Sequence, residues 1–561
     1  MKVSEYFAKK LVEYGATDAF GIPGGVILEL IYELAANENF CVHLNYHEQA
    51  SAYAACGYAQ STGKIGVAYA TKGPGFTNMM TAIAEAYYDS LPVLFVTAHS
   101  QSILNKKLRI ENEQEVNHIE FVKSMTKYAK RIDSLDQVIG SIEIALIEAT
   151  SGRKGPVVLD FATQILKSEL DGNINSFFYS NIRNNLIIDS CIEEIKTSLS
   201  EAKRPVMLVG DGIRFQNIEE NFKKLTRLLN IPILSSRFSQ DILCQNKNYY
   251  GYIGSHGLRY SNFILSKTDC IIAIGNRLAF PLESKSFSNI IYKAKIIRID
   301  VDENELERFI PNSVSFCIEA KKIINELLLN RVAYQKNEWM HVCEVLKENL
   351  FDADVNDGIS IIAEIISNLE LDDLVVCDIG NNELLTSRAY ALSGNGRKLL
   401  HSKTFKTVGS AIGKAIGAYY ANHKRVMCIM GDQGIQFNIQ ELQFISNNKL
   451  PIVVLICNNH ASEMLRDSEI KQGHSFFLHT TIQSGYSHPD YKKIAYAYNI
   501  DYIEINNIKQ VNSNIFKQIP QIIELSLNKD SEIVQFLPKG NPCQKFVPEL
   551  EETIYMNLDN L

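Results

Sequence analysis

Short runs of Val and Ile alternate with longer helical patterns along almost the whole of this 561-residue chain. Such apolar runs are typical of strands buried on both faces of a parallel sheet, and parallel strands need a crossover connection between them, usually a helix. The alternation therefore predicts the α/β class, built from doubly wound parallel sheets. Because 561 residues exceed the size of one hydrophobic core, we expect about three such domains.

The expected strands fall into three blocks along the chain. The first block has strands at Val42–Tyr46, Ile65–Thr71, Pro92–Ala98 and Pro156–Phe161, with helices at Gln49–Gln60 and Thr77–Tyr88. The second has strands at Pro205–Gly210, Ile233–Ser235, Ile271–Gly275 and Ile296–Asp300, followed by a helical segment from Glu319 to Asn349. The third has strands at Leu374–Asp378, Val426–Met430, Ile452–Cys457 and Ile533–Phe536. The expected domains are residues 1–166, 186–335 and 350–545, with an acidic tail at 546–561.

The composition excludes some classes of function. Hydrophobic residues make up 46% of the chain and the net charge is −8. No apolar run reaches the length of a bilayer span, so no membrane association is expected. Nucleic-acid binding would need clustered Lys and Arg, so no nucleic-acid partner is expected either. The first residues, MKVSEYFAKKLVEYGA, predict a charged amphipathic helix instead of a signal peptide. The 11 cysteines form no CxxC pair, as in a reduced compartment, and we therefore expect a cytoplasmic protein.

One carboxylate follows an expected strand at a point suited to a phosphate and its metal ion. The run GDQGIQFNIQEL, from Gly431, comes directly after the strand RVMCIM, and the next strand, PIVVLICNN, ends at Asn459. Asp432, the Asn459 amide and a backbone carbonyl near Ala461 are the oxygen ligands that Mg²⁺ prefers. Alternatively, Asp432 caps a helix and Asn459 belongs to an ordinary turn. The run alone leaves both interpretations open.

A second carboxylate, Glu48, lies where a strand ends and an Ala-rich helix begins, in LNYHEQASAYAACGYAQSTGK. Taken alone, it is best interpreted as a capping carboxylate at a helix N-terminus.

Together these two motifs resemble the thiamine diphosphate dependent family typified by acetolactate synthase. The resemblance spans nearly the full chain, and its other pieces come in the family's order: GIPGG from Gly21, TKGPGFTN from Thr71, DSLPVLFVTA from Asp89, SGRKGPVVLD from Ser151, VGDG from Val209, GSHG from Gly254, IDVDENEL from Ile299 and TFKTVGSAIGKAIGA from Thr404. It implies that the first domain binds the aminopyrimidine of the cofactor, that the last binds the diphosphate with Mg²⁺, and that a middle domain lies between them.

The resemblance also implies roles for single residues. Glu48 would hydrogen-bond the pyrimidine ring and promote removal of the proton from thiazolium C2. Val408 would be the apolar residue that bends the cofactor, and Gly24, Gly25 and Gln114 would line the reaction centre. The other positions implied to contact the cofactor are Pro23, Gly73, Asn78, Asn381, Gly431, Asp432, Gln433, Gly434, Asn459, Ala461, Ser462, Met464 and Leu465. Alternatively, Val408 is an ordinary core residue, the glycines serve turns, and Gln114 faces water.

Three departures from the family pattern bear on the cofactor or the substrate. Gln433 replaces a glycine beside Asp432, so the close approach of the backbone to the diphosphate would shift to Gly434. Lys72 replaces a small residue and either meets an anionic substrate or lies on the surface. Ser468 stands where the synthases carry a Trp that restricts the acceptor, and this predicts a bulkier acceptor.

The family's middle domain often carries FAD. The residues that match its contacts are Arg153, Gly210, Asp211, Gly212, Gly254, His256, Gly257, Gly275, Arg277 and Asp300. Beyond Arg277 the run continues as Leu278, Ala279, Phe280 and Pro281, so only the first half of the family pattern is present. The resemblance leaves FAD open, and a bound flavin would have a structural role.

The resemblance thus implies a thiamine diphosphate and Mg²⁺ dependent carboligase that decarboxylates a 2-keto acid, pyruvate first, and transfers the acyl unit to a carbonyl acceptor. The change at Ser468 favours a nucleotide-linked keto-deoxysugar as the acceptor. The alternatives are acetolactate synthase proper, a pyruvate oxidase, a cyclic diketone hydrolase and a non-catalytic homologue. Because the family assembles each site from Glu48 of one subunit and Asp432 of another, we expect a homodimer or homotetramer.

Overall fold

The computed structural model describes residues 1–100, 112–170, 185–214, 218–279, 293–336, 338–393, 396–528, 531, 533 and 535–561. These residues form two compact units. The first unit contains Met1–Ser180, Asp372–Glu383 and Lys398–Leu527, and the second contains Asn181–Leu371, Leu384–Arg397 and Asn528–Leu561. None of the helices in the described residues has both the length and the apolar character needed to cross a bilayer.

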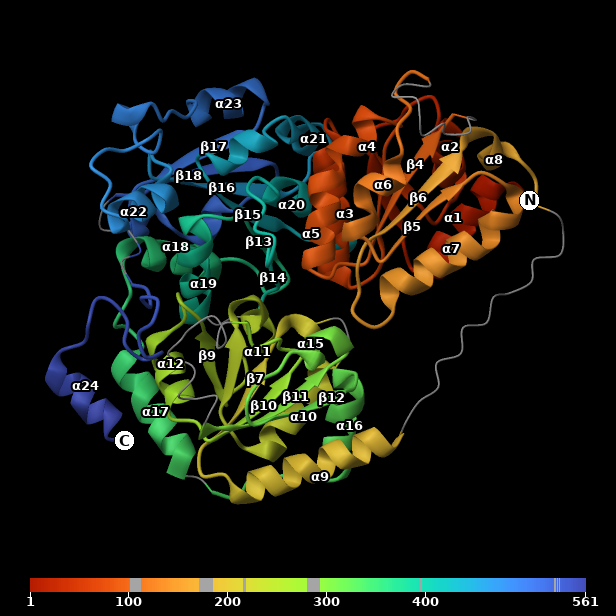
Figure 1. Cartoon of the computed structure of the whole chain (residues 1–561). Coiled ribbons are helices and arrows are strands. Elements are labelled where there is room, and N and C mark those ends of the chain that lie inside the picture. The colour runs from red at the N-terminus through yellow and green to blue at the C-terminus, as the bar shows by residue number, and fades with distance from the viewer. Residues whose placement is uncertain are drawn as a thin grey trace. The chain divides into compact units, whose positions relative to one another are not determined.

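The N-terminal sheet of the first unit has six parallel strands in the order β2-β1-β3-β4-β6-β5 (Figure 1). The strands are β1 (Asp18–Gly21), β2 (Cys41–Leu44), β3 (Gly66–Tyr69), β4 (Val93–His99), β5 (Tyr128–Ile132) and β6 (Val157–Ala162). The helices are α1 (Val3–Glu13), α2 (Leu28–Ala36), α3 (Glu48–Thr62), α4 (Pro74–Asn78), α5 (Met80–Tyr88), α6 (His118–Val122), α7 (Leu135–Thr150) and α8 (Thr163–Lys167). Every residue of β4 and β6 is buried, as expected for central strands of a parallel sheet covered on both faces.

The C-terminal sheet of the same unit also has six parallel strands, in the order β14-β13-β15-β16-β18-β17. Counted within each sheet, this order is the same as in the N-terminal sheet. The strands are β13 (Leu374–Cys377), β14 (Leu399–His401), β15 (Val426–Gly431), β16 (Ile452–Asn458), β17 (Asp501–Ile505) and β18 (Gln521–Ser526). The helices are α20 (Ala411–Asn422), α21 (Glu441–Asn447), α22 (Glu463–Lys471) and α23 (Tyr491–Ala497). Helix α19 (Asn381–Ser393) begins in this unit, and its residues from Leu384 onward belong to the second unit.

Helices α3 and α20, which occupy equivalent places in the two sheets, pack side by side (Figure 1). Small residues allow this approach, because a Cβ at Gly413 would lie 2.8 Å from the Ala50 carbonyl oxygen and a Cβ at Gly417 would overlap the backbone of Ala54. Since contacts advance in the same direction along both helices, their N-termini point toward the same side. The loops that carry the expected site residues Glu48 and Val408 therefore enter the helix pair from one side.

The central sheet forms the second unit, with six parallel strands in the order β12-β11-β10-β7-β8-β9. The order reverses between β7 and β10, as in dinucleotide-binding folds. The strands are β7 (Pro205–Val209), β8 (Ile233–Ser236), β9 (Tyr249–Ile253), β10 (Cys270–Ile274), β11 (Lys295–Asp300) and β12 (Ser313–Cys317). The helices are α9 (Asn185–Glu201), α10 (Glu219–Leu229), α11 (Gln240–Leu243), α12 (Arg259–Ser266), α15 (Glu303–Glu307), α16 (Ala320–Leu329), α17 (Glu338–Leu350), α18 (Asp357–Ser367) and α24 (Glu552–Asp559).

The predicted fold class, α/β with three parallel sheets, is confirmed. Three expected elements differ. The helix expected at Thr77–Tyr88 is divided between α4 and α5, and the segment Glu319–Asn349 is divided between α16 and α17. The described residues of the strand expected at Ile533–Phe536 form no strand, so this prediction is wrong for them, and Val534 lies outside the described residues. The place of the expected strand in the C-terminal sheet is taken by β18, while Phe536 makes only an isolated bridge with Val547. The next residue, Leu537, is buried in a core cluster of the second unit.

Candidate active site

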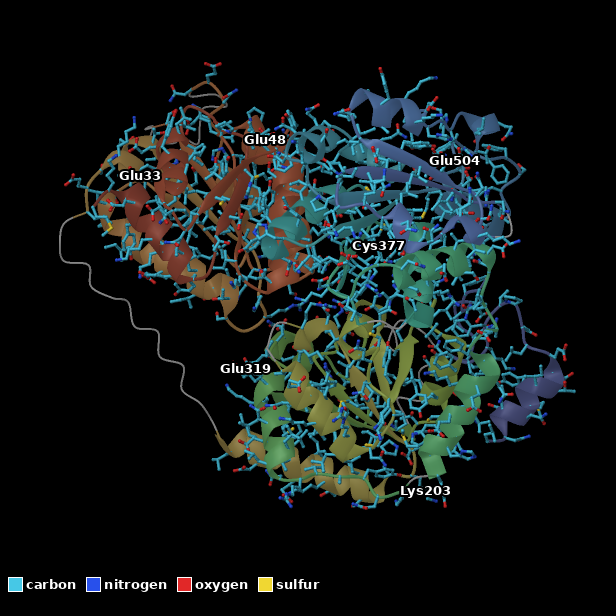
Figure 2. The ribbon with its side chains drawn as sticks, turned by 180° about the vertical axis from the view of Figure 1, so that it is seen from behind. Glu33, Glu48, Lys203, Glu319, Cys377 and Glu504 are labelled. Atoms are coloured by element: carbon cyan, nitrogen blue, oxygen red, sulfur yellow. The ribbon has the colours of Figure 1, made fainter. Side chains whose placement is uncertain are left out.

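Glu48 is the first residue of α3 (Figure 2). The side-chain amide of Asn78 donates a 2.9 Å hydrogen bond to Glu48 Oε2, and a Cβ at Gly75 would lie 3.3 Å from Glu48 Oε1. Both neighbours belong to the short helix α4, so the TKGPGFTN run is brought directly against the carboxylate that the sequence singles out.

Further loops gather around α4. A Cβ at Gly24 would clash with the side chain of Thr71, and a Cβ at Gly73 would lie 2.7 Å from the main-chain oxygen of Gln114. Gly73 also has φ +63°, which favours glycine. The structure thus brings together five predicted site residues, which we call the N-terminal cluster: Gly24, Glu48, Gly73, Asn78 and Gln114. Of the remaining two, Pro23 is exposed and a Cβ at Gly25 would meet no atom within 4 Å.

Asp432 lies directly after β15. Its Oδ1 accepts a 3.1 Å hydrogen bond from the Gln433 N–H, whereas Oδ2 is buried without a hydrogen-bond partner among the described residues. Burial raises the pKa of Asp432 to about 6, against the opposing effect of the Tyr486 hydroxyl, which faces the carboxylate but makes no hydrogen bond of normal geometry. The Tyr491 hydroxyl donates to the Asp432 carbonyl oxygen. A buried carboxylate oxygen without a partner suits a cation, so Asp432 fits the predicted metal.

Asn459 and Ala461 lie beyond the neighbouring strand β16. The Asn459 side chain donates a 2.6 Å hydrogen bond to Glu463 Oε2, and its Oδ1 accepts from the Ala461 N–H at 3.2 Å, which leaves one lone pair on that oxygen. Among the described ranges, no group of three His, Cys, Asp or Glu side chains is arranged to hold a metal ion. Mg²⁺ here would therefore rely on Asp432, amide and main-chain oxygens, and phosphate oxygens.

The loop that carries Val408 is held by a carboxylate that the sequence did not single out. Asp378, fully buried after β13, accepts hydrogen bonds from the Gly409 N–H at 3.0 and 2.9 Å, and burial raises its pKa to about 7. A Cβ at Gly434 would overlap Asp378 Oδ2 and lie 3.8 Å from Val408 Cγ1. Gly434 is therefore the position where the backbone must approach closely. The Gln433 side chain is exposed, so the departure from the family pattern does not fill this space.

Other predicted contacts gather at the same ends of the C-terminal strands. A Cβ at Gly431 would lie 3.4 Å from Asn382 Oδ1, and the Asn381 side chain donates a 3.4 Å hydrogen bond to Asp467 of α22. We call the residues at this edge the C-terminal cluster: Asn381, Val408, Gly431, Asp432, Gly434, Asn459 and Ala461.

The two clusters are tied together through Glu441, at the start of α21. This buried side chain accepts hydrogen bonds from the N–H groups of Tyr46 and His47 at 3.0 and 3.1 Å, and burial raises its pKa to about 7. Nearby, the Asn438 side chain donates a 2.9 Å hydrogen bond to the Gly409 carbonyl oxygen. Within the described residues of one chain, however, no hydrogen bond or ion pair joins Glu48 to Asp432.

Helix α22 carries the residues expected to shape the substrate pocket. Ser462 precedes its first turn, and Met464 and Leu465 expose 42% and 60% of their surface. Ser468 follows Met464 by one helical turn, so the two share a face of the helix. Its hydroxyl accepts a 2.9 Å hydrogen bond from Gln472.

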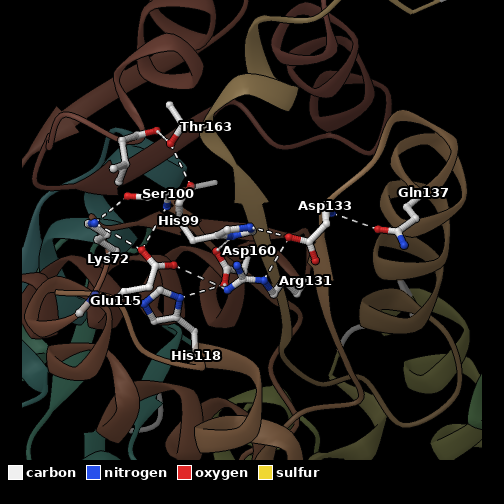
Figure 3. Close-up of polar contacts among 12 residues, drawn as sticks. Lys72, His99, Ser100, Glu115, His118, Arg131, Asp133, Gln137, Asp160 and Thr163 are labelled. Carbon is white, nitrogen blue, oxygen red and sulfur yellow. Dashed lines mark hydrogen bonds and ion pairs between the residues drawn. The ribbon is translucent and has the colours of Figure 1, made fainter. Parts of the chain in front are cut away.

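Lys72 lies neither on the surface nor in open contact with solvent. Its side chain is 12% exposed, and Nζ donates a 2.7 Å hydrogen bond to Ser100 Oγ and lies 3.4 Å from Glu115 Oε2 (Figure 3). Of the two interpretations drawn from the sequence, the surface residue is therefore wrong, and the substrate contact stays a prediction.

The residues predicted to contact FAD are spread over both units. Gly210, Gly212 and Gly275 pack tightly against one another, because a Cβ at Gly210 would overlap the Gly275 carbonyl oxygen and the Gly212 N–H donates to that oxygen at 3.2 Å. Gly257 N–H donates to Gly254 O at 3.0 Å in a closed turn.

The charged and polar members of this set are engaged with protein groups. In the second unit, Asp211 accepts a 2.6 Å hydrogen bond from Arg214, Asp300 Oδ1 accepts from the next two N–H groups, Arg277 Nη1 lies 3.8 Å from Glu305, and His256 Nδ1 lies 3.4 Å from the Gln535 carbonyl oxygen. In the first unit, Arg153 donates a 2.9 Å hydrogen bond to Ser90. Phe280 and Pro281 lie outside the described residues. FAD stays an open prediction.

Sequence reasoning missed Asp378, Glu441 and Asp89, which anchor the site loops. Asp89 accepts hydrogen bonds from the N–H groups of Lys403 and Thr404, both at 2.7 Å, and so holds the start of the Val408 loop. The partners of Asp89 and Glu441 lie more than 300 positions away in the chain, so no local pattern announces them. Asp378 could have been found from the sequence, since it lies at the end of an expected strand and Asp432 lies just beyond one.

Three family models match successive parts of the chain. Residues 1–121 match the thiamine pyrophosphate enzyme N-terminal TPP binding domain, residues 192–327 the central domain, and residues 378–527 the C-terminal TPP binding domain. The acetolactate synthase large subunit of Lactococcus lactis subsp. lactis (strain IL1403) is 29% identical, over 96% of this chain and 94% of the relative. The probable acetolactate synthase large subunit of Methanococcus aeolicus is 27% identical, over 98% and 96%. The chloroplastic acetolactate synthase 2 of Zea mays is 26% identical, over 97% and 88%.

Proposed function

Because the chain belongs to the thiamine pyrophosphate enzymes, as an acetolactate synthase-like member, we propose that it decarboxylates pyruvate and transfers the acyl unit to a carbonyl acceptor larger than a second pyruvate. A nucleotide-linked keto-deoxysugar is the acceptor that we favour. When bound, the cofactor supplies an acidic C2–H and an electron sink for the decarboxylation.

The protein's own groups would divide the work as follows. Asp432, Asn459 and Ala461 would hold Mg²⁺ and with it the diphosphate, and the partnerless Asp432 Oδ2 supports this assignment. Glu48, held by Asn78, would hold a proton at the pyrimidine ring nitrogen. Val408 would orient the two rings, with Asp378 fixing the loop beneath it. Met464 and Leu465 would exclude water from the reacting carboxylate, which favours loss of CO₂.

The larger acceptor depends on Ser468. It shares a face of α22 with Met464, and a serine there occupies far less volume than the tryptophan expected from the family pattern. A pocket that loses a large aromatic side chain can accept a bulkier ligand.

The test is product analysis. Purified protein is incubated with thiamine diphosphate, Mg²⁺ and pyruvate, alone and with aldehyde, keto-acid and sugar-ketone acceptors, and the products are weighed by mass spectrometry. We expect an acyl adduct of the larger acceptor. The variant Ser468→Trp should lose this adduct and keep the products of small acceptors, whereas Ser367→Trp, at an exposed position of α18, should behave as the unchanged protein. An acyl adduct that Ser468→Trp leaves undiminished would exclude this role for Ser468.

Acetolactate synthase proper is the second candidate, and the names of the similar proteins favour it. Acetolactate formed from pyruvate alone, with no preference for a larger acceptor, would support it. Consumption of oxygen or a quinone during pyruvate loss would indicate an oxidase, and cleavage of a cyclic diketone would indicate a hydrolase. Absence of saturable cofactor binding would indicate a non-catalytic homologue.

We further infer a homodimer or homotetramer in which Glu48 of one subunit serves the site of Asp432 in another. The lack of a direct link between these side chains among the described residues of one chain supports this inference, as do the exposed apolar residues Tyr46, Val408 and Phe437 near the clusters. Subunit exchange between the inactive variants Glu48→Gln and Asp432→Ala tests it. Hybrid dimers would regain one unmodified site, so about a quarter of the activity should return after complete mixing. A shared-site model predicts this recovery, and its absence despite proven exchange would contradict the model.

A further inference from the structure

A dense polar network lies beside the N-terminal cluster, where several strands of the N-terminal sheet end (Figure 3). Its members come from separate parts of the chain: Lys72 follows β3, His99 ends β4 and Ser100 follows it, Glu115 and His118 lie at α6, Arg131 and Asp133 lie in and after β5, and Asp160 lies in β6. The reaction outlined above uses none of these side chains.

The first part of the network joins Lys72 to Glu115. The Glu115 side chain is fully buried, and its Oε2 lies 3.4 Å from Lys72 Nζ and accepts a 3.3 Å hydrogen bond from the Ser100 N–H. Its other oxygen lies 3.8 Å from Arg131 Nη1. Breaking such a pair from one side leaves a buried charge without its partner, which is strongly destabilising. The ammonium group of Lys72 is therefore committed to Glu115.

The second part ends on a main-chain N–H of the N-terminal cluster. The Gly73 N–H donates a 3.0 Å hydrogen bond to His118 Nε2, so this nitrogen carries no proton. The proton of the ring is then on Nδ1, which donates to Asp160 Oδ2 at 2.9 Å. The tautomer of His118 is thus set by its two neighbours, and the ring acts as a neutral acceptor for the Gly73 turn.

Asp160 also holds His99. The His99 Nδ1 lies 2.8 Å from Asp160 Oδ1, and Nε2 lies 2.9 Å from Asp133 Oδ1. Burial by itself would raise the pKa of Asp160, but the hydrogen bonds from His118 and His99 outweigh it and keep this pKa below its ordinary value. Ionised carboxylates only accept hydrogen bonds, so His99 bonds to both when each of its ring nitrogens carries a proton.

With His99 in that form, the network is balanced in charge. Three cationic groups, Lys72, Arg131 and His99, face three carboxylates, Glu115, Asp133 and Asp160. Balanced and hydrogen-bonded charges tolerate burial, and such networks hold their members in one arrangement.

The arrangement that they hold is the contact between two reaction-centre loops. Lys72 and His118 act on either side of this contact, because Lys72 precedes Gly73 and His118 follows the Gln114–Glu115 segment. Gly73 and Gln114 approach so closely here that a Cβ at Gly73 would lie 2.7 Å from the Gln114 oxygen. Gly73 caps α4, whose last residue, Asn78, donates to Glu48.

We propose that Lys72 and His118 are positioning residues: they lock the Gly73–Gly75 turn against the Gln114–Glu115 segment and thereby hold Asn78 against Glu48. This inference rests on the proposed function, because the role of Glu48 belongs to it. It replaces the interpretation of Lys72 as a ligand for an anionic substrate.

The experiment measures exchange of the thiamine diphosphate C2 proton for deuterium on the loaded protein without substrate, together with cofactor affinity, kcat and KM for pyruvate. The variants are Lys72→Met, Glu115→Gln and their double variant, with circular dichroism and thermal unfolding as controls of the fold. We expect Lys72→Met to slow C2 exchange about 10- to 100-fold, as small displacements at a reaction centre do. The double variant leaves no buried charge unpaired but still lacks the Lys72–Glu115 contact, so it should exchange as slowly as Lys72→Met to within about threefold.

A substrate contact would give the opposite pattern. C2 exchange would then be unchanged in Lys72→Met, and KM for pyruvate would rise equally in the single and double variants. That result would overturn the positioning role of Lys72. It is distinguishable from failure of the proposed function, in which the unchanged protein itself would neither bind the cofactor nor exchange its C2 proton.

His118 provides an independent pair of variants in case Lys72→Met does not fold. Gln can accept from the Gly73 N–H and donate to Asp160, whereas Phe can do neither. His118→Gln should therefore keep C2 exchange within about threefold, and His118→Phe should slow it about 10- to 100-fold at similar cofactor affinity. Equal exchange rates in the two variants would contradict the role of His118.

Discussion

Replacing Asp432 with Asn should make the cofactor-free protein more stable and abolish metal-dependent cofactor binding. Asp432 is 3% exposed, and its Oδ2 lacks a hydrogen-bond partner among the described residues. A buried carboxylate of this kind lowers the stability of the fold whenever it is ionised. Asn keeps the shape of the side chain and removes the charge.

The size of the effect follows from the pKa, which burial raises from 3.8 to about 6. For an acid with a raised pKa, the associated stability is present below the unfolded value and is lost as pH rises through the folded value. Two pH units correspond to about 3 kcal/mol. The advantage of Asp432→Asn over the unchanged protein should therefore be about 1.5 kcal/mol at pH 5 and about 3 kcal/mol at pH 8.

Thermal unfolding of both proteins at pH 5, 6.5 and 8, with and without thiamine diphosphate and Mg²⁺, measures this. Ligands at a thousandfold excess over Kd stabilise a fold by about 4 kcal/mol, so the unchanged protein should overtake the variant when loaded. Asp501→Asn, an exposed carboxylate of the same sheet, should change neither curve appreciably. A cofactor-free Asp432→Asn that is less stable at pH 8, or that still binds the cofactor through Mg²⁺, would refute the reasoning.

Two other changes test neighbouring parts of the first unit. Tyr486→Phe removes a hydroxyl that lowers the pKa of Asp432, so Mg²⁺-dependent cofactor affinity should begin to fall at a higher pH on acidification, and an unchanged pH profile in calorimetric titration would contradict this. Glu85→Gln removes the ion-pair partner of the fully buried Lys414, between the two sheets, and should cost about 3–5 kcal/mol in chemical denaturation. Glu85→Leu combined with Lys414→Met should recover most of this loss, and a double variant no more stable than Glu85→Gln would show that the charge is not the cause.

Much of the fold could be predicted from the sequence, because strands buried on both faces appear as continuous apolar runs. β4, β15 and β16 were all predicted to within one residue at each end. Edge strands are harder. β2 and β12 contain exposed positions and β14 has only three residues, so their patterns are weak. The edge strands β5, β9, β12, β14 and β17 were not predicted, and neither were the interior strands β1 and β18. The run at Ile533–Phe536 misled because an apolar run does not by itself decide whether a segment joins a sheet.

Some residues of the candidate site could be predicted from the sequence and others could not. Glu48 and Asp432 stand at strand ends within recognisable motifs, so local sequence could single them out. The groups that hold their loops, Asp89, Glu441 and the Lys72 network, act through partners distant in the chain. Charge pairing of that kind depends on the folded arrangement, and no local pattern in one sequence encodes it.

The central claim, that Glu48 activates a cofactor anchored through Asp432, is tested most directly by the rate of C2 proton exchange in Glu48→Gln saturated with thiamine diphosphate and Mg²⁺. The account predicts an exchange rate at least about 100-fold below that of the unchanged protein, with cofactor affinity within about threefold. Equal exchange rates in the two proteins at full saturation would contradict it.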